Sequence, residues 1–359
     1  MPIRPARPLL LLAPLALAAL VMSACGGGGS GSANAGTTAP ASSSSGTPVT
    51  VKLGYFPNLT HATAIVGVQQ GIFAQALGPD KLQTSTFNAG PAAVEALFSG
   101  AVDASYLGPN PAINAYQQSH GQAIRIVSGA TSGGAALVVK PTINAASDLR
   151  GKKVATPQLG NTQDVALRYW LLGKGLTTDP QGGGDVSILP QDNATALQAF
   201  RTGQIDAAWE PEPWVSQMVA AGGKVLVNEK TLWPGGRFVT TELAVRTDFL
   251  KQHPDAVARL VQGQVRANDF VNQHPDEAQQ AVNQGLTQLT GKPLPAAVIK
   301  AAWPDLTFTD DPVASSLAGS AQHAQKVGLL PPIDLKGIYN LAPLDKALAQ
   351  ANEPQVKAA

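Results

Sequence analysis

Hydrophobic positions follow the same pattern in two segments of the chain, Val94–Tyr106 and Leu197–Trp209. In each segment, apolar residues stand six and three positions before a glycine, Gly100 or Gly203, and so share one face of a helix that ends there. An Asp-Ala pair follows within four residues and opens a short apolar run that ends in an aromatic residue, which predicts a strand. The repeat predicts two similar lobes, and clefts between lobes commonly bind small ligands. One copy alone would indicate only a common helix-to-strand turn.

Strand and helix patterns alternate along most of the chain. Val49–Leu53 alternates as a strand does, and Asn58 or Thr60 can cap the helix that follows. Asn88–Pro91 places a proline at the first turn of another helix, and Lys153–Thr156 predicts a further strand. This alternation predicts an α/β fold.

Two further segments contain a loop of small residues and a capped helix start. Ser128–Gly134 consists of small residues between two strand patterns, which predicts a loop that can approach a ligand with bare backbone where the chain crosses between lobes. Asn161 stands at the N-cap of a predicted helix, and Asp164 occupies the capping-box position.

The triplet His-Pro-Asp occurs twice, at His253–Asp255 and His274–Asp276. A repeated histidine beside an acid invites a metal or catalytic interpretation. Proline in the first turn with an acid near the positive end of the helix dipole explains both copies more simply, so we predict two helix starts.

The N-terminal residues have the three regions of a secretory signal. Arg4 and Arg7 precede the apolar run Leu9–Val21, which is too short to span a membrane. Met22–Cys25 resembles a bacterial lipobox, which implies a lipoprotein signal peptide over 1–24 and a lipid on Cys25. The alternative is cleavage after a small-residue site that releases the protein. An acyl chain would hold the protein on the outside of the cell membrane without spanning it.

Composition narrows the function further. Residues 25–48 are nearly all Gly, Ser, Ala, Thr and Pro, which predicts a flexible linker, so the folded part begins near Val49. The formal net charge is +1 and becomes +1 − 2 = −1 without Arg4 and Arg7, and no basic tract is present, which disfavours nucleic-acid binding. Because Cys25 is the single cysteine, disulfides and thiolate metal sites are excluded from the folded part.

Several predicted loops combine amide or small side chains with a helix start and carry few lysines or arginines. Helix N-termini offer unpaired N–H groups and a favourable dipole, which suits a compact anion. The polar side chains of these loops are those of Asn58, Asn88, Ser132, Gln158, Asn161 and Thr162. The alternative is that each residue only caps its own helix.

Aromatic residues lie in or next to the same loops and could pack the organic part of a ligand, although each alone is more typical of a core; they are Tyr55, Phe56, Tyr106, Trp209 and Trp214. Glu210 and Glu212 stand between the two tryptophans. They could receive an ammonium group or contact a partner, and for Glu212 we expect plain exposure to solvent.

No pattern of a catalytic or metal site is found. The chain lacks the Gly-x-Ser-x-Gly, His-Glu-x-x-His and Walker patterns. His61, His120 and His323 are far from one another in sequence, and we assign them structural or surface roles. We therefore expect no catalytic residue, no metal and no cofactor.

Four segments together resemble the solute-binding proteins of ABC importers, in particular the aliphatic sulfonate, nitrate and taurine group; they are Gly54–Ala62, Phe87–Pro91, Ala155–Asp164 and Trp209–Pro211. The resemblance extends from Val49 to about Leu348. It implies a type II periplasmic-binding-protein fold with two α/β lobes joined by two crossing strands, Ala135–Val139 and Val239–Val245. Lobe 1 would comprise 49–135 and 243–359, and lobe 2 would comprise 136–242.

The resemblance also implies that the anionic head of a ligand binds in the cleft to backbone amides and small polar side chains. The positions that match are Tyr55, Asn58, Asn88, Gly108, Asn110, Ser132, Gly133, Gln158, Asn161, Thr162 and Trp209. It implies a monomer that delivers a small organic anion, foremost an aliphatic sulfonate, to a membrane permease. Nitrate, taurine or a thiamine-pyrimidine precursor are alternative ligands, and an enzyme on the same scaffold is a further alternative.

Overall fold

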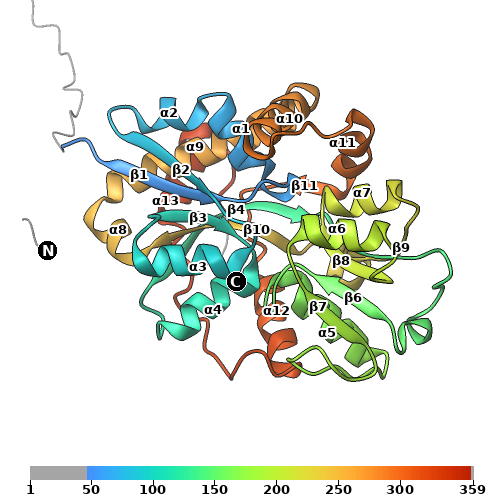
Figure 1. Cartoon of the computed structure of the whole chain (residues 1–359). Helices are drawn as coiled ribbons and strands as arrows, with labels where there is room; N and C mark the ends of the chain where they lie inside the picture. The colour runs from blue at the N-terminus through green and yellow to red at the C-terminus, as the bar shows by residue number, and fades with distance from the viewer. Residues whose placement is uncertain (1–46, 357–359) are drawn as a thin grey trace, which may run out of the picture. The chain divides into compact units, whose positions relative to one another are not determined.

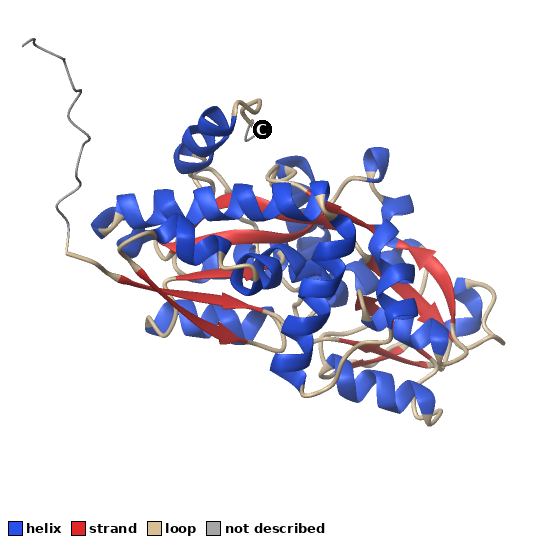
Figure 2. Cartoon of the chain, turned by 90° about the horizontal axis from the view of Figure 1, so that it is seen from above, coloured by secondary structure: helices blue, strands red, loops and turns tan. Residues whose placement is uncertain are grey.

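The computed structural model describes residues 47–356, which form two β-sheets flanked by helices (Figures 1 and 2). The six-stranded sheet A has the order β11-β4-β10-β3-β1-β2, and the five-stranded sheet B has the order β7-β6-β8-β5-β9. The strands of sheet A are β1 (Thr50–Tyr55), β2 (Lys81–Thr86), β3 (Ala104–Leu107), β4 (Ile124–Gly133), β10 (Val239–Arg246) and β11 (Leu306–Phe308). Those of sheet B are β5 (Ala135–Val139), β6 (Lys153–Thr156), β7 (Ser187–Pro190), β8 (Ala207–Pro211) and β9 (Lys224–Asn228).

Helices cover both sheets. On one side of sheet A, four helices pack on one another: α1, α2, α9 and α10. On the opposite side of this sheet lie α3 and α4 (Figure 1). The helices in the first half of the described chain are α1 (Ala62–Gln69), α2 (Ile72–Leu77), α3 (Gly90–Ser99), α4 (Pro109–Gln118), α5 (Thr162–Gly173) and α6 (Asn193–Arg201). The later helices are α7 (Trp214–Ala220), α8 (Thr247–Gln252), α9 (Pro254–Gln273), α10 (Pro275–Thr290), α11 (Ala296–Ala302), α12 (Ala314–Lys326) and α13 (Ala342–Ala351). Short 3-10 helices are η1 (Leu59–His61), η2 (Ala146–Leu149), η3 (Glu229–Leu232), η4 (Pro234–Gly236) and η5 (Trp303–Asp305).

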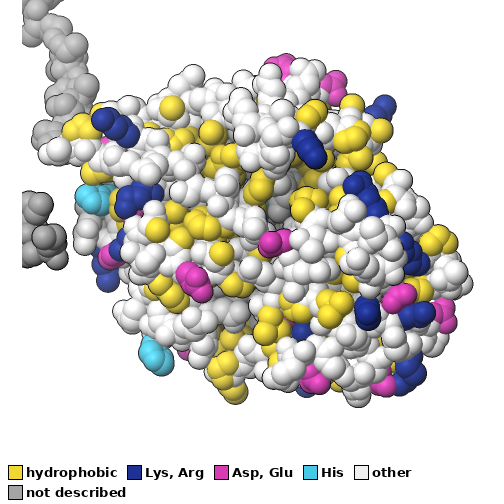
Figure 3. All heavy atoms as spheres, in the orientation of Figure 1, with side chains coloured by type: hydrophobic (Ala, Val, Ile, Leu, Met, Phe, Trp, Pro, Cys, Tyr) yellow, Lys and Arg dark blue, Asp and Glu magenta, His cyan; other side chains and the backbone are white. Residues whose placement is uncertain are grey.

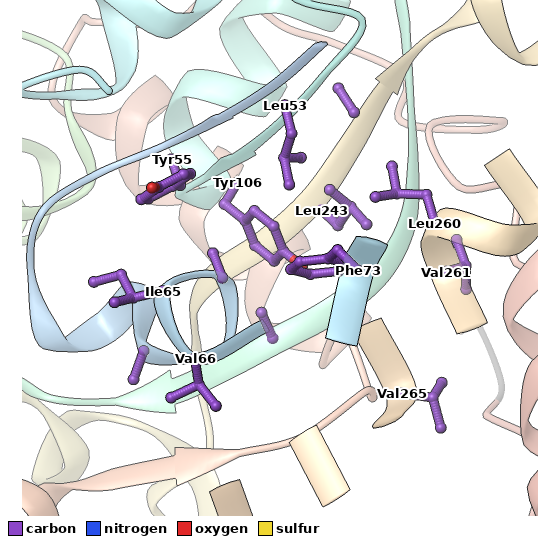
Figure 4. Close-up of a cluster of buried hydrophobic side chains, with 14 of the residues drawn as sticks. Leu53, Tyr55, Ile65, Val66, Phe73, Tyr106, Leu243, Leu260, Val261 and Val265 are labelled. Carbon is purple, nitrogen blue, oxygen red and sulfur yellow. The ribbon is translucent and has the colours of Figure 1, made fainter. Parts of the chain in front are cut away.

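Strand residues alternate between the two faces of each sheet. In β10, Leu243 and Val245 join the core on the α1 and α9 side, whereas Ala244 joins the core on the α3 and α4 side. Tyr106 packs beside Phe73 in the first of these cores (Figure 4). This period of two is expected for strands with helices on both faces.

Sheet B repeats the spatial arrangement of five strands of sheet A, and β11 has no counterpart in sheet B. In sheet A, β1 is parallel to β2 and β3, and β10 is antiparallel to β3. In sheet B, β6 is parallel to β7 and β8, and β5 is antiparallel to β8. The α/β fold with two similar lobes is therefore confirmed.

The repeat read from the sequence occupies equivalent places in the two lobes. Asp103 Oδ2 accepts a hydrogen bond from the backbone N of Lys52 at 3.0 Å, and Asp206 Oδ2 accepts one from Lys153 N at 2.9 Å. In each pair the aspartate N also donates to the lysine O, at 2.8 and 2.9 Å. The Gly-x-x-Asp-Ala pattern thus fixes the central strand of each sheet to its parallel neighbour.

The chain passes between the sheets at two places. β4 of sheet A continues through Gly134 into β5 of sheet B, and β9 returns to β10 through η3 and η4. The loop expected over Ser128–Gly134 is wrong, because β4 extends to Gly133. Its small residues serve close packing of neighbouring backbone: a β-carbon on Gly129 would lie 2.3 Å from Asp311 O. The lobe boundaries after 135 and 242 stay a prediction.

Both His-Pro-Asp triplets open helices, since Pro254 begins α9 and Pro275 begins α10, as predicted.

The signal peptide 1–24, Cys25 and most of the linker lie outside the described residues. In residues 47–356 no helix is long and apolar enough to cross a membrane. Charged side chains are scattered over the face shown in Figure 3, most of which is neither charged nor hydrophobic.

Candidate functional site

A small cavity of about 20 Å³ lies where residues of both lobes meet. Its lining contains no lysine, arginine, aspartate or glutamate. The lining residues are Phe56, Asn58, Thr60, His61, Asn88, Ala89, Gly108, Pro157, Asn161, Thr162, Gln163, Asn193, Pro211 and Thr240. The cavity is therefore polar but formally uncharged.

Four helix N-termini converge on this cavity. Ala89 is the N-cap of α3 and Gly108 that of α4, both in the sheet A lobe. Asn161 is the N-cap of α5, and Asn193 begins α6, both in the sheet B lobe. The first N–H groups of a helix have no partner within the helix, and its dipole favours negative charge there. Four such ends on one cavity make it suited to an anion.

The 3-10 helix η1 and its N-cap contribute two polar groups to the cavity, the amide of Asn58 and the imidazole of His61. Asn58 Oδ1 accepts a hydrogen bond from Thr60 Oγ1 at 2.9 Å. His61 Nδ1 accepts from the backbone N of Phe56 at 3.3 Å, so a neutral His61 carries its proton on Nε2. Burial lowers the pKa of His61 to about 3, which keeps the imidazole neutral at physiological pH. His61 was assigned a structural or surface role from the sequence, yet it lines the cavity; the one available signal was its place three residues after Asn58.

The loop before α5 is held by the buried side chain of Asp164. Its Oδ1 accepts from Thr156 Oγ1 at 2.9 Å, and its Oδ2 accepts from Gly160 N at 2.9 Å and from Arg168 Nε at 3.0 Å. Asn161 occupies the N-cap as predicted, but the capping-box pairing is wrong, because Asp164 binds the N–H of Gly160 and Asn161 makes no side-chain cap. The carboxylate therefore shapes the loop that carries Asn161.

Two buried oxygens of this region have no hydrogen-bond partner among the described residues, Thr162 Oγ1 and Gln158 Oε1. Thr162 lines the cavity. Because leaving a buried polar group unpaired costs about 1–3 kcal/mol, its hydroxyl is suited to pair with a ligand.

Five of the residues predicted for the site lie together around the cavity: Asn58, Asn88, Gly108, Asn161 and Thr162. The other six do not line it: Tyr55, Asn110, Ser132, Gly133, Gln158 and Trp209. Their part in a ligand site stays a prediction.

Specific contacts explain where four of these side chains lie. Trp209 Nε1 donates to Glu229 Oε2 at 2.8 Å in the core of the sheet B lobe, and Tyr55 packs in the core of the sheet A lobe. Asn110 Nδ2 donates to Ser320 O at 3.2 Å, and Ser132 Oγ accepts from Phe238 N at 3.2 Å. Each therefore contacts a protein group at the position where a ligand contact was expected.

A larger pocket of about 270 Å³ adjoins the cavity and shares Phe56, Asn58, Asn88 and Asn193 with it. Trp214 and Asp192 add an indole and a carboxylate to its lining. The polar cavity thus lies beside a roomier pocket lined by Phe56 and Trp214, which suits a ligand with a small anionic head and an organic tail.

Two glutamates flank this region. With the amide of Asn193 oriented to donate to Glu210 Oε2 at 3.1 Å, its oxygen accepts from Trp214 Nε1 at 3.1 Å. Burial raises the pKa of Glu210 well above its usual value. The exposure expected for Glu212 is wrong: its carboxylate is buried and accepts from Ser216 N at 3.1 Å at the start of α7.

Comparisons with known proteins give relatives that are named as binding proteins. The taurine-binding periplasmic protein of Escherichia coli is 29% identical over 184 residues, which is 50% of this chain and 54% of that protein. The bicarbonate-binding protein CmpA of Synechococcus elongatus is 27% identical over 262 residues, 65% of this chain and 56% of its own length. A Brucella abortus protein is 28% identical over 218 residues, and the match spans 64% of that protein and 59% of this chain.

Solved structures share the fold. The alkanesulfonate-binding protein SsuA from Xanthomonas axonopodis pv. citri, bound to MOPS, superposes with a TM-score of 0.66 at 21% identity, covering 80% of this chain and 96% of that one. The periplasmic nitrate-binding protein NrtA from Synechocystis PCC 6803 gives a TM-score of 0.73 at 17% identity, covering 86% and 90%. These likenesses confirm the two-lobed type II architecture.

The model of the NMT1-like family matches residues 44–286, which include every residue that lines the cavity. With the fold and this match in agreement, the chain belongs to the NMT1-like family.

Proposed function

We propose that the protein is the extracytoplasmic solute-binding component of an ABC importer and that its cleft binds an aliphatic sulfonate. The observation that carries the proposal is the convergence of four helix N-termini, two from each lobe, on an uncharged cavity. A sulfonate head is a compact anion that such N–H groups recognise without a basic side chain. The relatives named above as binding proteins support a role in binding and delivery.

The adjoining pocket favours a sulfonate over a bare inorganic anion. Nitrate or bicarbonate would occupy the polar cavity and leave the 270 Å³ pocket beside it unused, whereas an alkyl tail fills that pocket against Phe56 and Trp214. Asp192 also lines this pocket, which favours an aminoalkanesulfonate such as taurine as the second candidate. A pyrimidine would bind mainly by stacking on the aromatic residues.

Delivery requires that the lobes close on the ligand and present a surface to a membrane permease. Residues of both lobes line the cavity, so a ligand there contacts both at once. A ligand favours closure only by binding the closed form more tightly than the open one. We infer that the protein works as a monomer with the permease as its partner.

Isothermal titration of the purified protein with an alkanesulfonate, taurine, nitrate, bicarbonate and a hydroxymethylpyrimidine tests the proposal. We expect one-to-one binding of the sulfonate and a loss of about tenfold in affinity for Asn161→Ala, because one polar contact at the start of α5 is removed. Asn144→Ala is the matched control, since Asn144 is an exposed amide of the same lobe. Binding of the pyrimidine alone would overturn the ligand assignment. If none of the five compounds produced a heat of binding, that result would contradict the receptor role.

We further propose that Cys25 carries a lipid that holds the protein at the membrane. Support comes from the sequence, in which Arg4, Arg7 and the apolar run precede Met22–Cys25. A fatty-acid probe should label the wild-type protein in cells, and Cys25→Ser should abolish both the label and retention in the membrane fraction. Equal labelling of the two proteins would contradict the anchor.

A further inference from the structure

A pocket of about 520 Å³ lies between the C-terminal half of α5, the segment around η3 and helix α12. It shares no lining residue with the cleft cavity. The cavity lies at Thr162, where α5 begins, and this pocket reaches Gly173, where α5 ends. On α5 the cavity is lined as far as Gln163 and the pocket begins at Ala166, so at about 1.5 Å per residue their near edges lie roughly 5 Å apart along the helix. We call it the α5–α12 pocket.

Aromatic side chains form its walls. The rings of Tyr169 and His323 stack with centroids 3.7 Å apart, and Trp233 lies 5.0 Å from His323. Leu172 and Leu232 line the same pocket and are 49% and 45% exposed. A hollow that exposes aromatic and aliphatic groups together is typical of a binding site.

The charges at the rim are positive. Lys174 caps the C-terminus of α5, and Lys326 is the last residue of α12. Both line the pocket, and neither forms a salt bridge with any residue in 47–356. Lys174 Nζ lies 5.9 Å from the centroid of the Trp170 ring, so the cation is already beside the aromatic wall.

The carboxylate in this pocket is already paired with neutral donors. Glu229 Oε2 accepts from Trp209 Nε1 at 2.8 Å, and its Oε1 accepts from Trp233 Nε1 at 3.3 Å. Glu229 is 2% exposed, whereas Lys174 and Lys326 are exposed. A ligand that enters the pocket therefore meets two cations before it meets this acid.

We propose that the α5–α12 pocket is a second ligand site, which binds a planar aromatic carboxylate. The ring lies against Trp170 and Trp233, and the carboxylate lies between Lys174 and Lys326. Flat rings stack favourably on indoles, and exposed ion pairs add a modest attraction. Because no lining residue is shared with the cleft, this site does not depend on which solute the cleft binds.

Titration of the purified protein with 2-naphthoate tests the proposal by calorimetry. We expect one-to-one binding that weakens about three- to tenfold in the double variant Lys174→Gln/Lys326→Gln, which removes two exposed ion pairs. Lys300→Gln, an exposed lysine of α11, is the matched control and should bind as the wild type does. Asn161→Ala should also leave 2-naphthoate binding unchanged.

Any of four results would overturn the proposal. One is the absence of saturable binding of 2-naphthoate. Another is that the double lysine variant binds 2-naphthoate as tightly as the wild type does. A third is that Asn161→Ala weakens the binding of 2-naphthoate, which would place the probe in the cleft. The last is tighter binding of 2-naphthyltrimethylammonium than of 2-naphthoate, which would show that the pocket selects cations.

Discussion

Gly108 and Thr162 meet across the cleft so closely that a β-carbon on Gly108 would lie 2.3 Å from Thr162 Oγ1. Gly108 is the N-cap of α4 in the sheet A lobe, and Thr162 begins α5 in the sheet B lobe. Gly108 has φ −80°, a backbone conformation open to any residue, so the need for glycine comes from the approach of the two lobes. Two helix N-termini are thereby brought to one cavity.

Gly108→Ala should weaken ligand binding by about tenfold or more without lowering the free energy of unfolding. The added methyl group meets Thr162 only when the lobes approach, so it opposes closure while each lobe folds normally. Calorimetry with the ligand found for the wild type gives the affinity, and urea unfolding gives the stability. Gly173→Ala at the end of α5 is the control, because a β-carbon there would have no atom within 4 Å. Wild-type affinity for Gly108→Ala would show that closure tolerates the methyl group.

Arg168→Met should lower the free energy of unfolding by about 3–5 kcal/mol, because it leaves the Asp164 carboxylate buried without its cation. The side chains of Arg168 and Asp164 are 1% and 0% exposed, and their closest N and O atoms are 3.0 Å apart. Arg150→Met is the matched control, since Arg150 is 59% exposed and its pair with Asp185 is worth at most about 1 kcal/mol. Equal losses in urea unfolding would contradict a special role for the buried pair.

Much of the fold could be predicted because local sequence decides it. Gly100 has φ +73° and Gly203 has φ +74°, the left-handed conformation that glycine adopts at a helix end, so both copies of the repeat were visible in the sequence. Asn58, Asn161 and Thr162 likewise stand at helix starts, and helix starts at the ends of sheet strands converge in this fold.

The rest depends on contacts between distant segments. Ser132 lies in β4 between Val239 of β10 and Thr307 of β11, so its small side chain serves strand packing, which the sequence around it does not show. Asn110 is held by Ser320, 210 residues away. Glu212 has the polarity of a surface residue, yet tertiary structure buries it at the start of α7.

Asp103→Ala should lower the free energy of unfolding by about 1–3 kcal/mol, because it leaves a part-buried strand N–H without its acceptor, and Asp206→Ala should lower it by less, because water reaches the equivalent exposed N–H. The two variants control for each other. Amide exchange of Lys153 should accelerate in Asp206→Ala while that of Lys52 does not, and the reverse should hold in Asp103→Ala. Acceleration of both amides in either variant would show that the two contacts do not act locally.

The contribution of Glu229 to stability should fall as the pH rises from 5 to 8, so Glu229→Gln should lose less stability across this range than the wild type does. Burial raises the pKa of Glu229 from 4.5 to about 7, so in this window the folded protein holds a proton that the unfolded chain has released. The stabilisation is complete below pH 4.5 and is lost as the pH passes 7, which amounts to about 2–3 kcal/mol between pH 5 and 8. Burial raises the pKa of Glu212 and of Asp310 to about 7 as well, so part of the fall should persist in the variant.

Urea unfolding of the wild type and Glu229→Gln at pH 5 and pH 8 measures this difference. Gln204→Glu, which adds an exposed carboxyl in the same lobe, is the control and should leave the pH dependence as it is, since a solvated carboxyl titrates alike in the folded and unfolded states. Glutamine can accept from the two indoles through one oxygen only, so the variant loses stability at both pH values. The quantity to compare is therefore the change in the free energy of unfolding between pH 5 and pH 8, in the variant and in the wild type. A fall as steep in Glu229→Gln as in the wild type would show that Glu229 is ionised in the folded protein throughout this range.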